Sequence, residues 1–218
     1  MLRVTRVLRT LVVLGIVLAS LVPSAVQAER VKVLILGDSV ASVLRWSPTS
    51  MKSLWKGSYD VTLEVWGCQK LVDPGCIEGN APQASALRLL QKHRDEEFDI
   101  VVVATGYNDT GATYLQQSIR RIYAEVSSQG GHLMWLTYRE NGNVKIKARQ
   151  FNKVVKSQSK KLGFSVLDWE AIARRQKHWF TGDGVHMNAH GGVRLGNHIR
   201  RALDEYLTPV ATTMPENS

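Results

Sequence analysis

Short apolar segments alternate with longer amphipathic segments along most of this chain. The apolar segments are rich in Val, Ile and aromatic residues, as buried strands are, and they span residues 31–36, 61–66, 98–104, 132–138 and 164–169. Segments with apolar residues at helical spacing span 84–93, 114–126, 145–162 and 189–206, the last with Asn188 as its expected N-cap. Strands that alternate with helices predict an α/β protein with a parallel sheet covered on both faces. Ligands bind such sheets at the carboxyl ends of the strands.

The first 28 residues have the pattern of a secretion signal rather than of a folded element. Arg3, Arg6 and Arg9 precede an uncharged run at residues 11–22, and small residues follow up to Ala28. The run has 12 residues, against roughly 20 in a membrane-spanning helix. We therefore expect cleavage after Ala28 and a secreted, periplasmic or cell-envelope protein, with an uncleaved membrane anchor as the alternative. The expected boundaries are a leader at 1–28, one domain at 29–210 and a tail at 211–218.

Positive charge is concentrated in two parts of the chain. The formal net charge is +9, of which the leader holds +3, residues 141–162 hold +7 and everything else holds −1. Two interpretations of the basic segment remain open. The segment from Lys145 to Lys161 contacts an anionic cell-envelope polymer or lipid headgroups, or it is a solvated helix face. Because no aromatic residues are interleaved in a nucleic-acid-binding pattern and the chain carries an export signal, the charge does not predict nucleic-acid binding.

Two cysteines, Cys68 and Cys76, flank a turn signal at Asp73-Pro74-Gly75. In an exported chain this arrangement predicts a local disulfide bond, with two free buried thiols as the alternative. Two cysteines are too few for a structural zinc site of the usual kind. Because the first cysteine directly follows Gly67, we expect the bond to rigidify the loop at the end of the second strand.

Four of the five expected strands are followed by residues that can carry chemistry. The groups are Gly37-Asp38-Ser39-Val40, Gly67, Gly106-Tyr107-Asn108-Asp109 and Asp183-Gly184-Val185-His186. A serine near a helix N-terminus can act as a nucleophile, and an asparagine amide can stabilise an oxyanion. A carboxylate three residues from an imidazole can orient a general base. Taken alone, each group also fits an ordinary loop: a capping serine, a loop glycine, an Asx turn, and a surface aspartate beside a hydrogen-bonded histidine.

Other kinds of site find less support in the sequence. The nucleophile-elbow pattern Gly-x-Ser-x-Gly is absent, and no Gly-x-Gly-x-x-Gly follows the first strand. Asp183, His186 and His190 have a spacing that metal ligands can adopt. However, His190 is expected inside the last helix, and a catalytic zinc ion needs three well-placed ligands. The metal site is therefore the weaker interpretation of these residues.

In this order the four groups resemble the sequence blocks of the SGNH hydrolases, also called GDSL hydrolases. The resemblance covers residues 31–206, with Val40 where the family usually has Leu. It implies a three-layer α/β/α sandwich with a five-stranded parallel sheet, a flavodoxin-like arrangement. The resemblance implies neither a metal nor another cofactor.

The same resemblance assigns a role to each matching residue. Ser39 would be the nucleophile, His186 the general base and Asp183 the carboxylate that orients the base. The oxyanion hole would be formed by the backbone N–H groups of Ser39 and Gly67 and by the side-chain amide of Asn108.

These roles predict an exported serine esterase or deacylase that forms an acyl-enzyme, with an O-acylated glycan or lipid as substrate. Two alternatives remain open: an O-acyltransferase with the same triad, and a non-catalytic envelope-binding module on the same scaffold. Similar cysteine pairs occur in some SGNH domains linked to O-acetylation of cell-surface glycans, which is a loose resemblance. Trp46, Trp55, Trp179 and Phe180 flank the four groups, where they either line a sugar or acyl pocket or pack in the core.

Overall fold

The computed structural model describes residues 30–56 and 59–208, so the expected leader at 1–28 and the tail at 211–218 lie outside the described residues. Five strands form one parallel sheet in the order β2-β1-β5-β6-β7. They are β1 (Val31–Gly37), β2 (Tyr59–Val65), β5 (Ile100–Ala104), β6 (His132–Leu136) and β7 (Ser165–Leu167). The predicted five-stranded parallel sheet is confirmed, and the strand ends lie within two residues of the expected ones.

Helices connect the strands throughout the described residues. They are α1 (Val43–Trp46), α2 (Pro48–Leu54), α3 (Ala86–Lys92), α4 (Ala112–Ser128), α5 (Lys145–Leu162), α6 (Trp169–Ala173) and α7 (Ala189–Leu207). Three short 3₁₀ helices and a small hairpin complete the described elements: η1 (Arg94–Glu96), η2 (Gly142–Val144), η3 (Lys177–Trp179), β3 (Ile77–Glu78) and β4 (Ala81–Pro82). The four predicted helices are confirmed as α3, α4, α5 and α7, whereas α1, α2 and α6 were not predicted. None of the helices within 30–56 and 59–208 combines the length and the apolar character needed to cross a bilayer.

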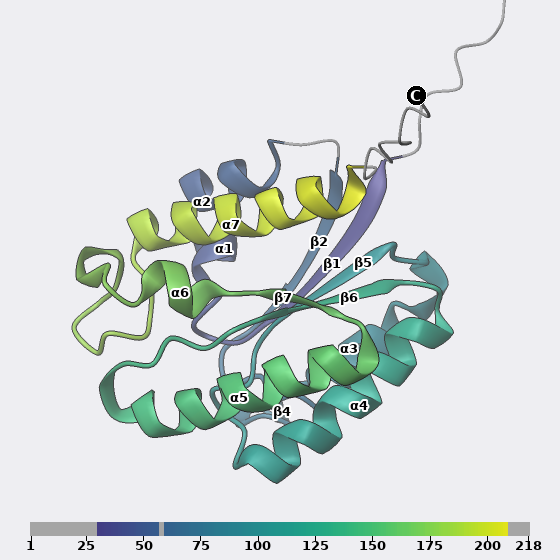
Figure 1. Cartoon of the computed structure of the whole chain (residues 1–218), viewed down its shortest axis with the longest axis horizontal. Coiled ribbons are helices and arrows are strands. Elements are labelled where there is room, and N and C mark those ends of the chain that lie inside the picture. The colour runs from purple at the N-terminus through teal and green to yellow at the C-terminus, as the bar shows by residue number, and fades with distance from the viewer. Residues whose placement is uncertain (1–29, 57–58, 209–218) are drawn as a thin grey trace, which may run out of the picture.

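The helices form two layers, one on each face of the sheet. Helices α1, α2, α6 and α7 cover one face, and α3, α4 and α5 cover the other (Figure 1). Strand β1 shows why both faces are buried: Val33 and Ile35 point into the first core and Leu34 and Leu36 into the second, all four without exposed surface. The chain is therefore the predicted three-layer α/β/α sandwich.

Helix α7 is held in place by its N-cap and by two glycines. The Asn188 side chain accepts a hydrogen bond from a backbone N–H in the first turn, as expected for an N-cap. Farther along, Gly192 and Gly196 face α2, where a Cβ atom on either would collide with Ser50 or Ser53. These glycines let the two helices approach closely, and this packing fixes the loop that precedes α7.

Candidate active site

Ser39 lies in the turn between β1 and α1, at the carboxyl edge of the sheet. The preceding residue, Asp38, is completely buried. Its carboxylate accepts hydrogen bonds from the backbone N–H groups of Val40 (3.0 Å), Gly106 (3.1 Å) and Tyr107 (3.1 Å). Burial raises the pKa of Asp38, and these hydrogen bonds oppose the shift. The buried carboxyl group thus ties the loop after β1 to the loop after β5, and it fixes the start of the turn that carries Ser39.

The three predicted catalytic residues form one continuous chain of hydrogen bonds. The distance from Ser39 Oγ to His186 Nε2 is 2.9 Å, and the distance from His186 Nδ1 to Asp183 Oδ2 is 2.5 Å. Since an ionised carboxylate can only accept, Nδ1 carries the imidazole proton and Nε2 is left to accept the serine proton. The arrangement therefore has the geometry of an activated serine nucleophile with an oriented general base.

The carboxylate of Asp183 also holds its own turn together. Its Oδ1 atom accepts hydrogen bonds from the backbone N–H groups of Val185 (2.8 Å) and His186 (3.0 Å) and from the hydroxyl of Thr181 (3.0 Å). Burial alone would raise the pKa of Asp183, but the hydrogen bonds outweigh burial and hold this pKa below its ordinary value. Asp183 is therefore ionised at neutral pH, as an orienting carboxylate must be.

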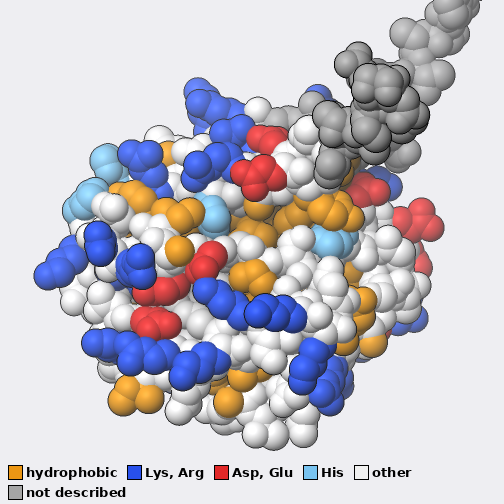
Figure 2. All heavy atoms as spheres, in the orientation of Figure 1, with side chains coloured by type: hydrophobic (Ala, Val, Ile, Leu, Met, Phe, Trp, Pro, Cys, Tyr) orange, Lys and Arg blue, Asp and Glu red, His pale blue; other side chains and the backbone are white. Residues whose placement is uncertain are grey.

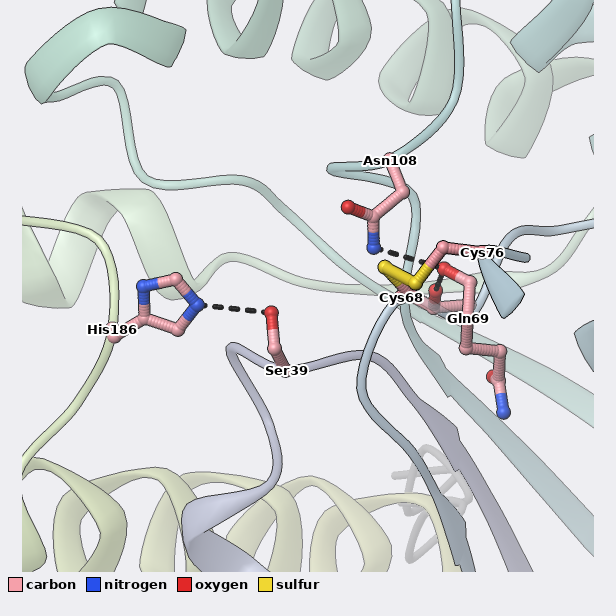
Figure 3. The surroundings of a disulfide bond; sticks show 7 residues. Ser39, Cys68, Gln69, Cys76, Asn108 and His186 are labelled. Atoms are coloured by element: carbon pink, nitrogen blue, oxygen red, sulfur yellow. Dashed lines mark hydrogen bonds between the residues drawn. A yellow bond between two sulfur atoms is a disulfide. The ribbon is translucent and has the colours of Figure 1, made fainter. Parts of the chain in front are cut away.

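Asn108 lies on the other side of Ser39 from His186 (Figure 3). Its side-chain Nδ2 donates to the backbone carbonyl of Gln69 at 3.1 Å, so the loop after β2 fixes the direction of the amide. An amide nitrogen carries two protons, and this hydrogen bond uses one of them. The second proton is available for a ligand oxygen, which is the function expected of an oxyanion donor.

The loop after β2 contains Gly67 and the predicted disulfide. The backbone N–H of Trp66 donates to the carbonyl of Gly37 at 2.9 Å, which brings the start of this loop beside the turn that carries the serine. Cys68 and Cys76 are joined by a disulfide, with their Cα atoms 5.5 Å apart. Figure 3 shows this bond next to the amide of the oxyanion candidate. The predicted disulfide is confirmed.

A cleft of about 380 Å³ opens over these residues, and most of the predicted site residues line it. The lining residues are Ser39, Val40, Tyr107, Asn108, Asn143, Val144, Asp183, Val185 and His186. Gly67 does not line the cleft, so the structure brings together four of the five predicted residues. Asn143 and Val144 were not predicted. They follow β6, the one strand whose carboxyl end carried no recognised group, although polar residues crowd the sequence there.

Two other predicted groups lie away from the cleft. Trp179 and Phe180 are buried in the core, whereas Trp46 and Trp55 are exposed, and none of the four lines the cleft. His190 lies in the first turn of α7 and lines a different surface pocket. The core interpretation is therefore right for two of the four aromatic residues, and His190 does not join the catalytic turn.

The basic segment forms most of α5, and three of its seven cations bind groups of this chain. Lys147 donates to two backbone carbonyls, Arg149 pairs with Glu140, and Lys156 pairs with Asp168. The other four, Lys145, Lys153, Lys160 and Lys161, are exposed. Figure 2 shows Lys and Arg side chains gathered over this helix. The surface charge of α5 is thus smaller than the sequence suggests, but it is still positive.

No family model matches the sequence, and no curated protein matches it. Solved structures with the same architecture do match. A carbohydrate acetylesterase family member from Sinorhizobium meliloti is 18% identical with a TM-score of 0.64, over 81% of this chain and 98% of that one. A GDSL-like lipase from Bacteroides thetaiotaomicron is 13% identical with a TM-score of 0.62, over 82% and 90%.

A third similar structure is a member of the lipolytic G-D-S-L family from Veillonella parvula. It is 14% identical with a TM-score of 0.60, over 84% of this chain and 99% of that one. At such identities the similarity establishes the fold, and it extends over nearly the whole length of the matched proteins. The chain therefore has the fold of the SGNH, or GDSL, hydrolases.

Proposed function

We propose that the protein is a serine esterase that cleaves O-acyl groups through an acyl-enzyme. The observation that carries this proposal is the hydrogen-bonded chain from Ser39 through His186 to Asp183, which opens into a cleft at the carboxyl edge of the sheet. A histidine with a purely structural role does not require simultaneous hydrogen bonds to a serine hydroxyl and to a carboxylate. The shared fold with esterases supports the same activity.

Acylation begins when Ser39 Oγ attacks the ester carbonyl carbon while His186 Nε2 accepts the hydroxyl proton. The positive charge that forms on the imidazole is stabilised by the Asp183 carboxylate. The amide of Asn108 and the backbone N–H group of Ser39 stabilise the oxyanion. Collapse of the tetrahedral intermediate then breaks the ester bond, and His186 returns the proton to the leaving alcohol.

Deacylation uses the same groups in reverse. His186 removes a proton from water, and the resulting hydroxide attacks the acyl carbonyl. The ester bond to Ser39 Oγ breaks, the serine recovers its proton from the imidazole, and a free carboxylic acid leaves. If a sugar hydroxyl replaces water at this step, the same residues transfer the acyl group instead of hydrolysing it.

We propose an O-acylated glycan of the cell envelope as the substrate. Three observations support it: the export pattern before Ala28, the open cleft, and the fold shared with a carbohydrate acetylesterase family member. Val40, Val144 and Val185 give the cleft apolar walls that suit a small acyl group, and Asn143 offers an amide for sugar hydroxyls. The four exposed lysines of α5 would attract a polymer that also carries negative charge.

A serine-directed fluorophosphonate tests the catalytic proposal. Wild-type protein should be labelled and should release acetate from an O-acetylated glycan, whereas Ser39→Ala should do neither. Ser127→Ala, which changes an exposed serine on α4, is the matched control and should behave as wild type. Absence of Ser39-dependent labelling and turnover would favour a binding module. Acetylated acceptor sugar in the products would identify a transferase.

The lysines are tested by retention on a polyanion column. Replacing Lys145, Lys153, Lys160 and Lys161 together by Gln should lower the salt concentration needed for elution, because four exposed charges are lost. Turnover of a small neutral ester should stay unchanged. Equal elution of the variant and the wild type would overturn the proposed contact.

A further inference from the structure

The connection between β6 and α5 (residues 137–144) carries none of the predicted site residues, yet it runs along the cleft. It contributes Asn143 and Val144 to the lining. Arg139, which is buried within it, and Lys147, which is half-buried in the first turn of α5, bind the loops that carry the proposed catalytic groups. Their contacts indicate what this connection does.

Arg139 holds the turn that carries the general base. Its side chain is 1% exposed, its Nη1 donates to the backbone carbonyl of Gly184, and its guanidinium lies 3.6 Å from the centre of the Phe180 ring. Gly184 lies within the turn that runs from Asp183 to His186. The guanidinium therefore contacts both the middle of this turn and the Phe180 ring, three residues before the turn begins.

The burial of this arginine is costly for the fold. Within the described residues, Nε and Nη2 of Arg139 have no hydrogen-bond partner. Burial lowers the pKa of Arg139, and the nearby Glu170 carboxylate opposes that shift. Because unpaired buried donors reduce stability, an apolar residue of similar size would make the folded state more stable. A role in positioning explains why a guanidinium is present here.

Lys147 holds the loop that carries the oxyanion amide. Its Nζ donates to the backbone carbonyls of Tyr107 (2.6 Å) and Asp109 (3.3 Å), the two residues on either side of Asn108. The same loop is bound from the connection itself, since the backbone N–H of Arg139 donates to the Tyr107 hydroxyl at 2.6 Å. The connection thus contacts both halves of the site.

We propose that Arg139 and Lys147 are positioning residues that set His186 and Asn108 at their working distance from Ser39. This rests on the proposed esterase function. Arg139 acts through the turn that ends at His186, and Lys147 acts through the carbonyls that flank Asn108. A displacement of about 1 Å at a reacting group can cost up to about a hundredfold in rate, so modest loosening of either loop is expected to be visible in kcat.

Lys147 is tested through its coupling to Asn108. With a fluorogenic acetyl ester, Lys147→Met should lower kcat about tenfold with little change in KM, and Lys147→Arg should recover part of the loss. In an Asn108→Ala background the same change should cost less than about twofold, because the amide it positions is gone. Lys52→Met, which changes an exposed lysine of α2, is the control and should leave kcat unchanged.

Arg139 is tested through its coupling to Asp183. Arg139→Lys should lower kcat about tenfold in the wild-type background and less than about twofold in an Asp183→Asn background. The Lys147→Met loss should persist in the Asp183→Asn background, because it acts through the other loop. Circular dichroism and thermal unfolding establish that each variant is folded. If Arg139→Lys does not fold, the comparison of Lys147→Met in the wild-type and Asn108→Ala backgrounds decides the proposal.

The outcomes separate this proposal from the proposed function. Coupling of each cation to its own partner supports the positioning roles. Equal fold-losses in every background, or no loss at all, overturn them while leaving the esterase proposal intact. Absence of Ser39-dependent turnover and labelling in the wild type overturns both.

Discussion

Gly142 offers a way to move the turn that carries Asp183 and His186 without altering any side chain of the proposed catalytic chain. Its backbone has a φ of +56°, in the left-handed region, and it lies against the turn that carries Asp183. A Cβ atom built on Gly142 would lie 2.6 Å from the backbone carbonyl oxygen of Asp183. Because that neighbour is backbone, it cannot rotate away as a flexible side chain can. Gly142→Ala is therefore expected to displace the turn.

The size of the displacement follows from the contact distance. Ordinary Cβ contacts begin at 3.4 Å, so the two atoms must separate by about 0.8 Å. A shift of this size at Asp183 is expected to tilt the imidazole of His186, which is hydrogen-bonded to its carboxylate. We expect kcat to fall between about tenfold and a hundredfold. Stability should also fall by about 1–2 kcal/mol, since alanine disfavours the left-handed region.

Gly163→Ala provides the matched control for backbone strain. Gly163 follows α5 with a φ of +84°, and a Cβ atom there meets nothing within 4 Å. This variant should lose a similar amount of stability, seen as a decrease in Tm of roughly 2–4 °C per kcal/mol, but keep wild-type kcat. Thermal unfolding and ester turnover of both variants are the measurements. Equal kcat values for Gly142→Ala and Gly163→Ala would refute the reasoning.

Three further predictions concern the loops around the cleft. Asn108→Ala should keep the fold and lower kcat by about 10²–10³-fold, as loss of an oxyanion donor does; near wild-type turnover would count against its role. Burial raises the pKa of Asp109 to about 7, so the folded state retains a proton that the unfolded state has lost, and the free energy of unfolding should fall as pH rises from about 4 to about 7. The Tm of Asp109→Asn should therefore gain on that of the wild type as pH rises through this window, and a constant difference would contradict the assignment. Replacing Cys68 and Cys76 by Ser should lower the free energy of unfolding by about 2.5 kcal/mol, because the bond closes a loop between residues 8 positions apart. The same change should lower kcat, because the loop holds the Gln69 carbonyl that fixes the Asn108 amide. Chemical denaturation and turnover test this, and unchanged values would contradict it.

The sequence was sufficient to predict the architecture because hydrophobic periodicity follows directly from burial. Each strand of a doubly covered sheet must be apolar on both faces, and β1 is the clearest case. The helices between β1 and β2 could not be predicted in the same way. Helices α1 and α2 are only four and seven residues long and are separated at Ser47, so neither displays a full helical period.

The hydrogen-bonded chain of Ser39, His186 and Asp183 could also be predicted, since its members follow strands whose carboxyl ends meet at one edge. Arg139 and Lys147 could not. In the sequence one is an isolated cation after a strand, and the other belongs to a run of positive charge that is typical of a solvated helix face. Their contacts with Gly184 and Tyr107 join segments far apart in the chain, and no local pattern specifies such contacts.

Ser39 and His186 lie 147 positions apart in the sequence, which has a consequence for biosynthesis. The proposed nucleophile is made well before its proposed base, so a nascent or prematurely terminated chain that stops before His186 lacks the residue that would accept the serine proton. Helix α7 begins three residues after His186, and its packing against α2 joins the last helix of the described residues to one of the first. The proposed hydrolytic activity therefore requires the turn after β1 and the loop before α7 to have met, and turnover during refolding would report completion of the fold rather than its onset.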